Sequence, residues 1–106
     1  MTPLNPTPTT RLAEVSPAGA DSFRKLREQM LQAGPLDNTT CELIVISGFA
    51  QLGWESSFKI HALRLVRANV AKAVLQHAVM APLGATTVVY QVALALKWIE
   101  ELYAET

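Results

Sequence analysis

The segment from Thr86 to Tyr103 constrains the fold of this 106-residue chain more than any other. Apolar side chains stand on nearly every side of the helix that it predicts, and its polar exceptions include Lys97 and Glu101, four residues apart. A helix of this kind has to be buried on most of its sides. Because the chain is long enough for only one small domain, we expect a second subunit to supply part of the cover.

The composition also indicates a homo-oligomer. Half of the residues are hydrophobic and 17% are charged, against about 25% charged in typical globular chains. Large apolar surfaces on a folded protein mark interfaces. Nine basic and nine acidic residues cancel, and no basic cluster stands out, so we expect neither nucleic acid nor an anionic membrane as a partner.

The single cysteine and the first residues of the chain indicate where the protein is located. Cys41 is the single cysteine, which excludes an internal disulfide and a cysteine-based zinc framework. The first eight residues lack the basic and apolar regions of a secretory signal, and no apolar run reaches the roughly 18 residues of a membrane span. We therefore expect a cytoplasmic protein.

The chain divides into residues 1–17, a flexible N-terminal arm, and residues 18–106, a helical domain. The arm holds four of the six prolines, and proline removes a backbone donor and interrupts a helix. Disorder is one interpretation of the arm, and an arm lying across a neighbouring subunit is the other.

The spacing of apolar residues predicts an all-α fold of five or six helices. The expected helices cover residues 19–33, 37–51, 55–68, 70–80 and 86–103. Asp37 is a good N-cap for the second helix, and Gly53 follows its end. The run Leu43–Ile46 also fits a buried strand, but the helical spacing around it favours a helix. On the third helix, Lys59 and Arg67 are expected to point outward.

The segment 34–61 carries the most informative motif. It contains Leu36-Asp37 and then Thr40-Cys41-Glu42-Leu43-Ile44, followed by Trp54-Glu55, Phe58 and His61. This pattern resembles the carboxymuconolactone decarboxylase and alkylhydroperoxidase D-like family, and the resemblance extends over about residues 22–103. In the redox branch of that family a Glu-x11-Cys-x2-Cys-x3-His motif occupies this place.

Two substitutions separate the branches of the family. Glu42 and His61 keep the spacing, but Trp54 and Ser57 stand at the two cysteine positions. A serine hydroxyl does not replace an attacking thiolate without a strong base, and Cys41 has no resolving partner. Thiol peroxidase activity is therefore excluded. The residues Trp54-Glu55, Phe58 and His61 are similar to the decarboxylase branch, which lacks the cysteine pair.

The resemblance implies a small alkylhydroperoxidase D-like bundle that assembles as a homotrimer or homohexamer. It also implies a lyase or isomerase, without a cofactor or metal, for a small unsaturated lactone or carboxylic acid. His61 would transfer protons, since its usual pKa lies near neutrality, and Glu42 would orient it. Arg64, three residues after His61, is a candidate for holding a carboxylate. Three further side chains are candidate walls of the substrate pocket: Trp54, Phe58 and Met80.

Other interpretations stay open at this point. The chain is alternatively a non-catalytic member of the fold, kept for ligand binding or assembly, or a related cyclase. A histidine facing an apolar core is often structural, and Glu42 fits an ion-paired glutamate equally well. His77 is expected to be structural or at an interface. About four residues of the family pattern are missing between Val70 and Ala78, which leaves the start of the fourth helix open.

Overall fold

We analysed a computed structural model, which describes residues 7–105. The described part of the chain is all-helical, as expected, and contains six helices: α1 (Pro8–Val15), α2 (Pro17–Leu31), α3 (Asn38–Leu52), α4 (Glu55–Arg67), α5 (Lys72–Met80) and α6 (Val89–Ala104). None of these helices is long and apolar enough to cross a membrane.

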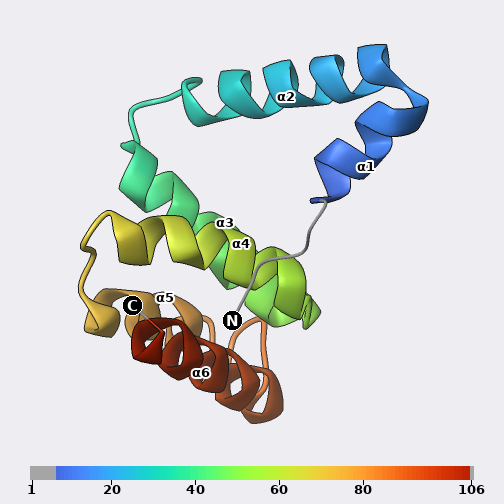
Figure 1. Ribbon diagram of the computed structural model, residues 1–106. Coiled ribbons are helices and arrows are strands. Elements are labelled where there is room, and N and C mark those ends of the chain that lie inside the picture. Colours follow the sequence, from blue (N-terminus) through green and yellow to red (C-terminus); the bar gives the residue numbers. More distant parts are fainter. Residues whose placement is uncertain (1–6, 106) are drawn as a thin grey trace.

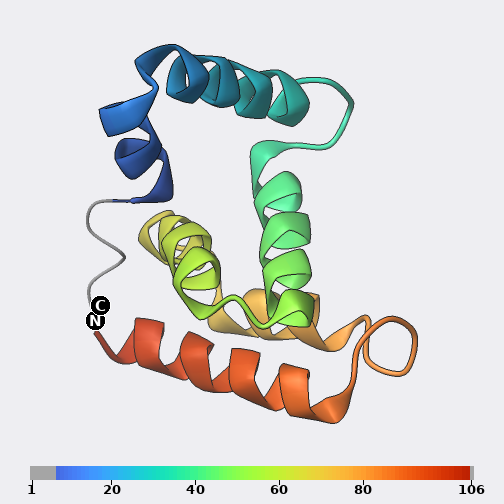
Figure 2. The same ribbon diagram turned by 90° about the vertical axis from the view of Figure 1, so that its right-hand side faces the viewer.

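Helices α3 to α6 form a bundle, and α1 and α2 form a separate hairpin (Figures 1 and 2). Within the bundle, α3 packs on α4, α5 and α6, and α6 also packs on α4 and α5. The hairpin helices pack mainly on each other and have few contacts with the bundle. The hairpin stands apart from the bundle in both views, and the loop of residues 32–37 connects it to α3.

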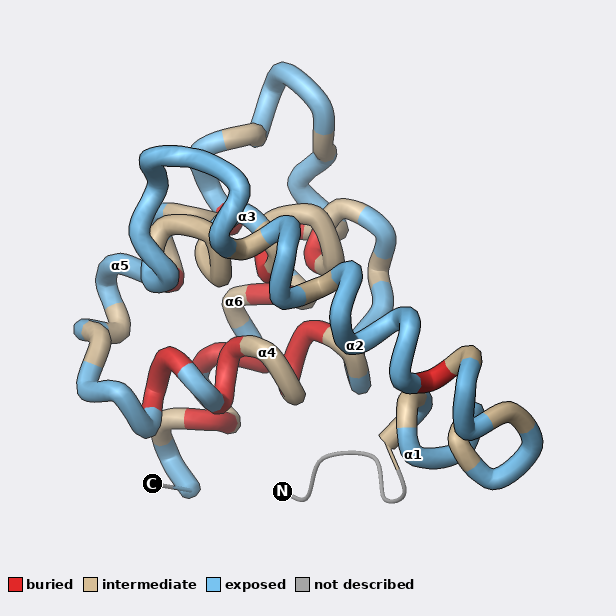
Figure 3. The backbone as a smooth tube through the Cα atoms, turned by 90° about the horizontal axis from the view of Figure 1, so that it is seen from above, coloured by how far each residue is buried: buried red, intermediate tan, exposed pale blue. Residues whose placement is uncertain are grey.

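The hydrophobic core lies entirely within the bundle. Its fully buried large side chains are Ile46, Phe58, Leu75, Val79, Ile99 and Leu102. Figure 3 shows the buried positions concentrated along α4 and its neighbours, whereas the hairpin is mostly exposed. In α2 only Ala20 is buried. The bundle is therefore held by apolar burial between four helices, and the hairpin contributes little to that core.

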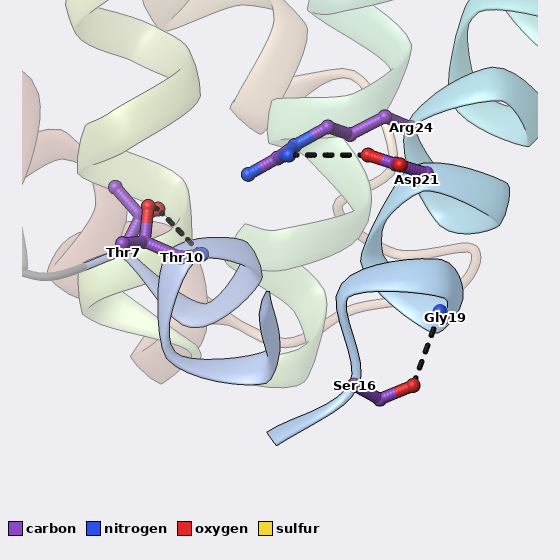
Figure 4. A network of polar contacts seen from close by, with 6 residues as sticks. All are labelled: Thr7, Thr10, Ser16, Gly19, Asp21 and Arg24. Atoms are coloured by element: carbon purple, nitrogen blue, oxygen red, sulfur yellow. Dashed lines mark hydrogen bonds and ion pairs between the residues drawn. The ribbon is translucent and has the colours of Figure 1, made fainter. Parts of the chain in front are cut away.

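The prediction that proline blocks helix in residues 8–17 is wrong, and the caps explain why. Pro8 and Pro17 occupy first turns of α1 and α2, where a missing backbone N–H costs nothing. Thr7 accepts a hydrogen bond from the Thr10 backbone N–H at 3.3 Å, and Ser16 accepts one from Gly19 at 3.1 Å (Figure 4). Proline therefore starts both helices of the hairpin. The rest of the expected arm, residues 1–6, lies outside the described residues.

The predicted ends of α3 are confirmed. The Asp37 carboxylate accepts a hydrogen bond from the Thr40 backbone N–H at 2.7 Å, and Gly53 ends the helix with φ of 74°. A left-handed residue at this position suits glycine, which has no Cβ to strain the backbone. The β-branched run around Ile46 is helical, so its tertiary packing overrides its strand propensity.

The segment before α5 is a tight turn over residues 68–71. Asn69 takes a left-handed conformation with φ of 63°, which asparagine adopts more readily than most residues. The Tyr103 hydroxyl on α6 donates a hydrogen bond to the Val70 carbonyl at 2.6 Å. The turn is thus tied to the last helix, and α5 begins at Lys72 rather than at Val70.

The expectation that Lys59 points outward is also wrong. Its side chain is only 7% exposed, and its ammonium donates to Glu55 at 2.8 Å and to Glu101 at 2.9 Å. Burial alone would lower the pKa of Lys59, but the hydrogen bonds that its ammonium donates to the two carboxylates, together with their negative charges, outweigh burial and raise that pKa. Lys59 therefore joins α4 to α6 through Glu101.

Candidate functional site

Glu42 and His61 meet where α3 packs on α4. The His61 Nδ1 atom lies 3.0 Å from the Glu42 Oε2 atom. Both side chains are largely shielded, with 18% of His61 and 12% of Glu42 exposed. The two-residue turn at Gly53-Trp54 folds α4 back along α3, so residues 19 positions apart become neighbours. The expected contact between this acid and this imidazole is confirmed.

The contact determines which imidazole nitrogen is available for chemistry. An ionised carboxylate only accepts hydrogen bonds, so Nδ1 carries the proton and donates it to Glu42. The Arg64 guanidinium lies 3.4 Å from the same Nδ1 but cannot donate to a nitrogen that is already protonated. The lone pair is then on Nε2, and Glu42 acts as the group that orients the ring.

The surroundings keep Glu42 ionised. The hydrogen bond from His61 is the largest influence that lowers the pKa of Glu42, while burial raises it. Electrostatic attraction to His61, Arg64 and Arg27 lowers the pKa of Glu42 further. The ionised carboxylate therefore remains a hydrogen-bond acceptor for the Nδ1–H of His61.

Phe49 is a site residue that the sequence analysis missed. Its ring centroid lies 5.3 Å from that of His61 and 6.0 Å from that of Trp54. Glu42, Val45 and Phe49 recur at intervals of three and four, so they share one face of α3. That spacing is the signal that would have found Phe49 from the sequence.

A cavity of about 760 Å³ opens beside His61, between the hairpin and the bundle. The hairpin contributes Thr7, Thr9, Phe23, Arg24, Arg27, Glu28 and Leu31 to its wall, and the bundle contributes Val45, Phe49, His61 and Arg64. The imidazole therefore faces a space large enough for a small molecule, with aromatic and guanidinium groups around it.

The expected pocket walls are distributed differently from the prediction. Arg64 lines the cavity, 61% exposed and 3.8 Å from Glu42. Phe58 does not, because it is fully buried against Trp98 with ring centroids 5.3 Å apart. Trp54 is 55% exposed behind Phe49, and Met80 is 42% exposed at the end of α5, outside the cavity. Phe58 is thus a core residue, and Trp54 supports the cavity through Phe49.

A second, more open groove of about 870 Å³ runs between α3 and α5. It is lined mainly by small and aliphatic side chains, among them Leu43, Ile44, Gly48 and Val74. His77 lies on this groove rather than near His61. Within residues 7–105 no three histidine, cysteine, aspartate or glutamate residues gather in a way that would hold a metal ion.

Comparisons of this chain with protein-family models, with curated proteins and with solved structures give no match.

Proposed function

We propose that this protein is a cofactor-free lyase or isomerase, similar to carboxymuconolactone decarboxylases, for a small unsaturated lactone or carboxylic acid. The observation that carries the proposal is the 3.0 Å contact between His61 and Glu42 at the wall of a cavity. The motif resemblance of residues 34–61 supports it. The homotrimer or homohexamer implied by that resemblance belongs to the proposal as well.

In the decarboxylase reaction, the bond between the ring carbon and the carboxylate breaks and carbon dioxide leaves. The electron pair of that bond enters the conjugated system as a dienolate. His61, protonated on both nitrogens, then delivers the Nε2 proton to the terminal carbon of the dienolate, and the double bond moves. In an isomerase reaction, Nε2 removes a proton from one carbon and returns it to another.

The other site residues support these proton transfers. Glu42 holds Nδ1–H and offsets the positive charge on the ring, so it is a positioning residue. Arg64 offers a guanidinium beside the same space, and guanidinium binds carboxylate in a bidentate manner. Phe49, whose ring centroid lies 5.3 Å from that of His61, excludes water from one side of the imidazole, which strengthens its electrostatic interactions.

Turnover by matched histidine variants tests the proposal. We expect His61→Gln to lower kcat/KM on a panel of unsaturated lactone acids by about 10²- to 10⁴-fold, the usual contribution of general acid–base catalysis. His77→Gln is the matched control, because it changes the other histidine and leaves activity intact. Circular dichroism and thermal unfolding verify that both variants fold.

Two results would contradict the lyase. One is a His61→Gln variant as active as the unmodified protein. The other is no turnover of any compound by the unmodified protein, which would favour the ligand-binding or assembly alternative.

A further inference from the structure

The groove between α3 and α5 is lined without a charged side chain. None of its twelve lining residues is Asp, Glu, Lys or Arg, and segments 43–54 and 73–96 of the sequence contain no such residue at all. Ile44 and Val74 on its walls are large, apolar and exposed. Monomeric proteins rarely leave a continuous apolar surface open to water, and charged residues are depleted at the centres of interfaces. The groove therefore has the composition of an interface.

The shape of the groove fits a helix. Along α3 its lining extends from Thr40 to Gln51, about 16 Å at 1.5 Å per residue. A Cβ atom placed on Gly48 would meet nothing within 4 Å beyond its own helix backbone and its chain neighbours, so the groove is open there. Small side chains let a second helix approach closely. The small lining residues are Ser47, Gly48, Ala73, Ala78 and Ala81.

Helix α2 carries an apolar stripe that matches this groove. Positions 19, 23, 26 and 30 are separated by four, three and four residues, the spacing of a seam that packs against another helix, and they hold Gly19, Phe23, Leu26 and Met30. The three large side chains are each about half exposed. Leu26 and Met30 do not line the cavity beside His61, and the hairpin has few contacts with its own bundle. The stripe is therefore available to a partner.

The α2 helix of the same chain lies on the wrong side of α3 for this groove. Its cavity-lining residues face Val45 and Phe49 across the cavity. At 3.6 residues per turn, the groove-lining positions 40, 44, 47 and 51 lie about half a turn away from positions 45 and 49. One α2 cannot line the cavity and fill a groove on the opposite face of α3 at the same time, so the α2 in the groove has to come from a second copy.

We propose that the apolar stripe of α2 from one copy docks in the α3–α5 groove of the next copy. The stripe and the groove lie on different surfaces of the chain, so the contact is head-to-tail, and repeating it closes a ring or extends a filament. A ring of three copies would form the homotrimer. The inference rests on the homo-oligomer included in the proposed function, but not on the lyase chemistry.

Sedimentation of the full chain tests the docking. We expect the unmodified protein to sediment as an oligomer. Leu26→Glu and Gly48→Glu should each sediment as a single chain, because each places a carboxylate without a partner in the apolar contact. Ser56→Glu is the matched control. It adds the same charge at an exposed position of α4 that lines neither the groove nor the cavity, so it should keep the oligomer.

Mixing the two variants is the sharper test. Leu26→Glu keeps an intact groove and Gly48→Glu keeps an intact stripe, so one contact survives between them. We expect an equimolar mixture to form pairs of chains that neither variant forms alone. Met30→Glu and Ile44→Glu, at two residues about half exposed, repeat the experiment if circular dichroism shows that a variant of the first pair does not fold.

Three results would overturn the docking. If the unmodified protein sediments as a single chain, the oligomer and the docking fail together, and turnover alone decides the lyase. If Leu26→Glu and Gly48→Glu both stay oligomeric, the oligomer stands and its contact lies elsewhere. The third result is a mixture of the two variants without pairs.

The histidine variants separate the docking from the lyase. His61→Gln should sediment as the unmodified protein does while losing turnover, because His61 does not line the groove. His77→Gln keeps its place as the activity control, since His77 is exposed on the groove and glutamine leaves the aliphatic lining unchanged. Docking in a protein without turnover would leave the docking standing and the lyase refuted.

Discussion

At the scale of single residues, the pair of Glu42 and His61 combines chemistry with stability. The carboxylate is ionised because the imidazole hydrogen bond, helped by nearby positive charges, lowers its pKa. The pKa of this carboxyl group is lower in the folded protein than its value of about 4.5 in the unfolded chain. Such a group stabilises the fold fully at pH values above the unfolded pKa. That stabilisation disappears as the pH falls through the lower folded value.

Glu42→Gln tests this at two pH values. At pH 7 we expect the variant to lose about 1 kcal/mol of unfolding free energy, the usual net worth of such a hydrogen bond. At pH 3 the difference should shrink, because this pH lies below the unfolded value of about 4.5 and proton uptake by the unfolded chain removes part of the advantage of the ionised carboxylate in the fold. Urea denaturation at both values measures it. An equal loss at pH 3 and pH 7 would show that the charge of Glu42 is not what stabilises the pair.

At the scale of elements, Lys59 is the polar link between α4 and α6. Its ammonium is nearly enclosed, while Glu55 and Glu101 are 53% and 40% exposed. The pKa of Lys59 is raised in the fold. The contribution of Lys59 to the free energy of unfolding is therefore fully present at pH values below its unfolded pKa of about 10.5, and it is lost as the pH rises through the folded pKa. The pKa of Glu101 is lowered, mainly by its hydrogen bond to Lys59, so its contribution is lost in acid. The ion pair of Lys59 and Glu101 therefore stabilises the fold at pH values above the folded pKa of Glu101 and below the folded pKa of Lys59.

Lys59→Met keeps most of the side-chain volume and removes the charge. We expect a loss of about 1 to 2 kcal/mol at pH 7, modest because both carboxylates can turn to water. Lys97→Met on the exposed side of α6 is the control and should stay within about 0.5 kcal/mol. Chemical denaturation measures the free energy of unfolding of the two variants. Equal stability of both would mean that the ion pairs of Lys59 contribute nothing.

At the scale of the whole molecule, the structure has a core-bearing bundle and a hairpin outside that core. The hairpin exposes large apolar side chains, with Phe23, Leu26 and Met30 each about half exposed. Val88, Val89 and Tyr90 at the start of α6 are more exposed still. A second subunit would cover these apolar side chains in the predicted oligomer, and the oligomer itself stays a prediction.

Native-state hydrogen exchange measures the difference between the two parts. We expect amides of α1 and α2 in the free protein to exchange at least about tenfold faster than those of α4 and α6, because local opening is easiest where few apolar contacts are lost. The bundle helices serve as the internal reference. Protection of α2 equal to that of α4 in the free protein would mean that another surface holds the hairpin down.

Local sequence was sufficient for the two ends of α3. Asp37 and Gly53 bound α3 as predicted, because a cap and a left-handed glycine act within a few residues. The facing of Glu42 and His61 also follows from a short turn between two predicted helices. Composition and periodicity likewise predicted an all-helical chain, since these patterns reflect the backbone geometry of a single segment.

Tertiary structure decided the rest, because burial depends on residues far apart in the chain. Phe58 had the right spacing for a pocket wall, yet Trp98 from α6 covers it. Lys59 had the character of a surface residue until Glu101 came within 2.9 Å. Arg24 and Arg27 line the same cavity as His61 only because the fold places α2 across that space from α3 and α4. A sequence pattern records the face that a residue occupies on its own helix, whereas only the packing of helices determines what lies opposite that face.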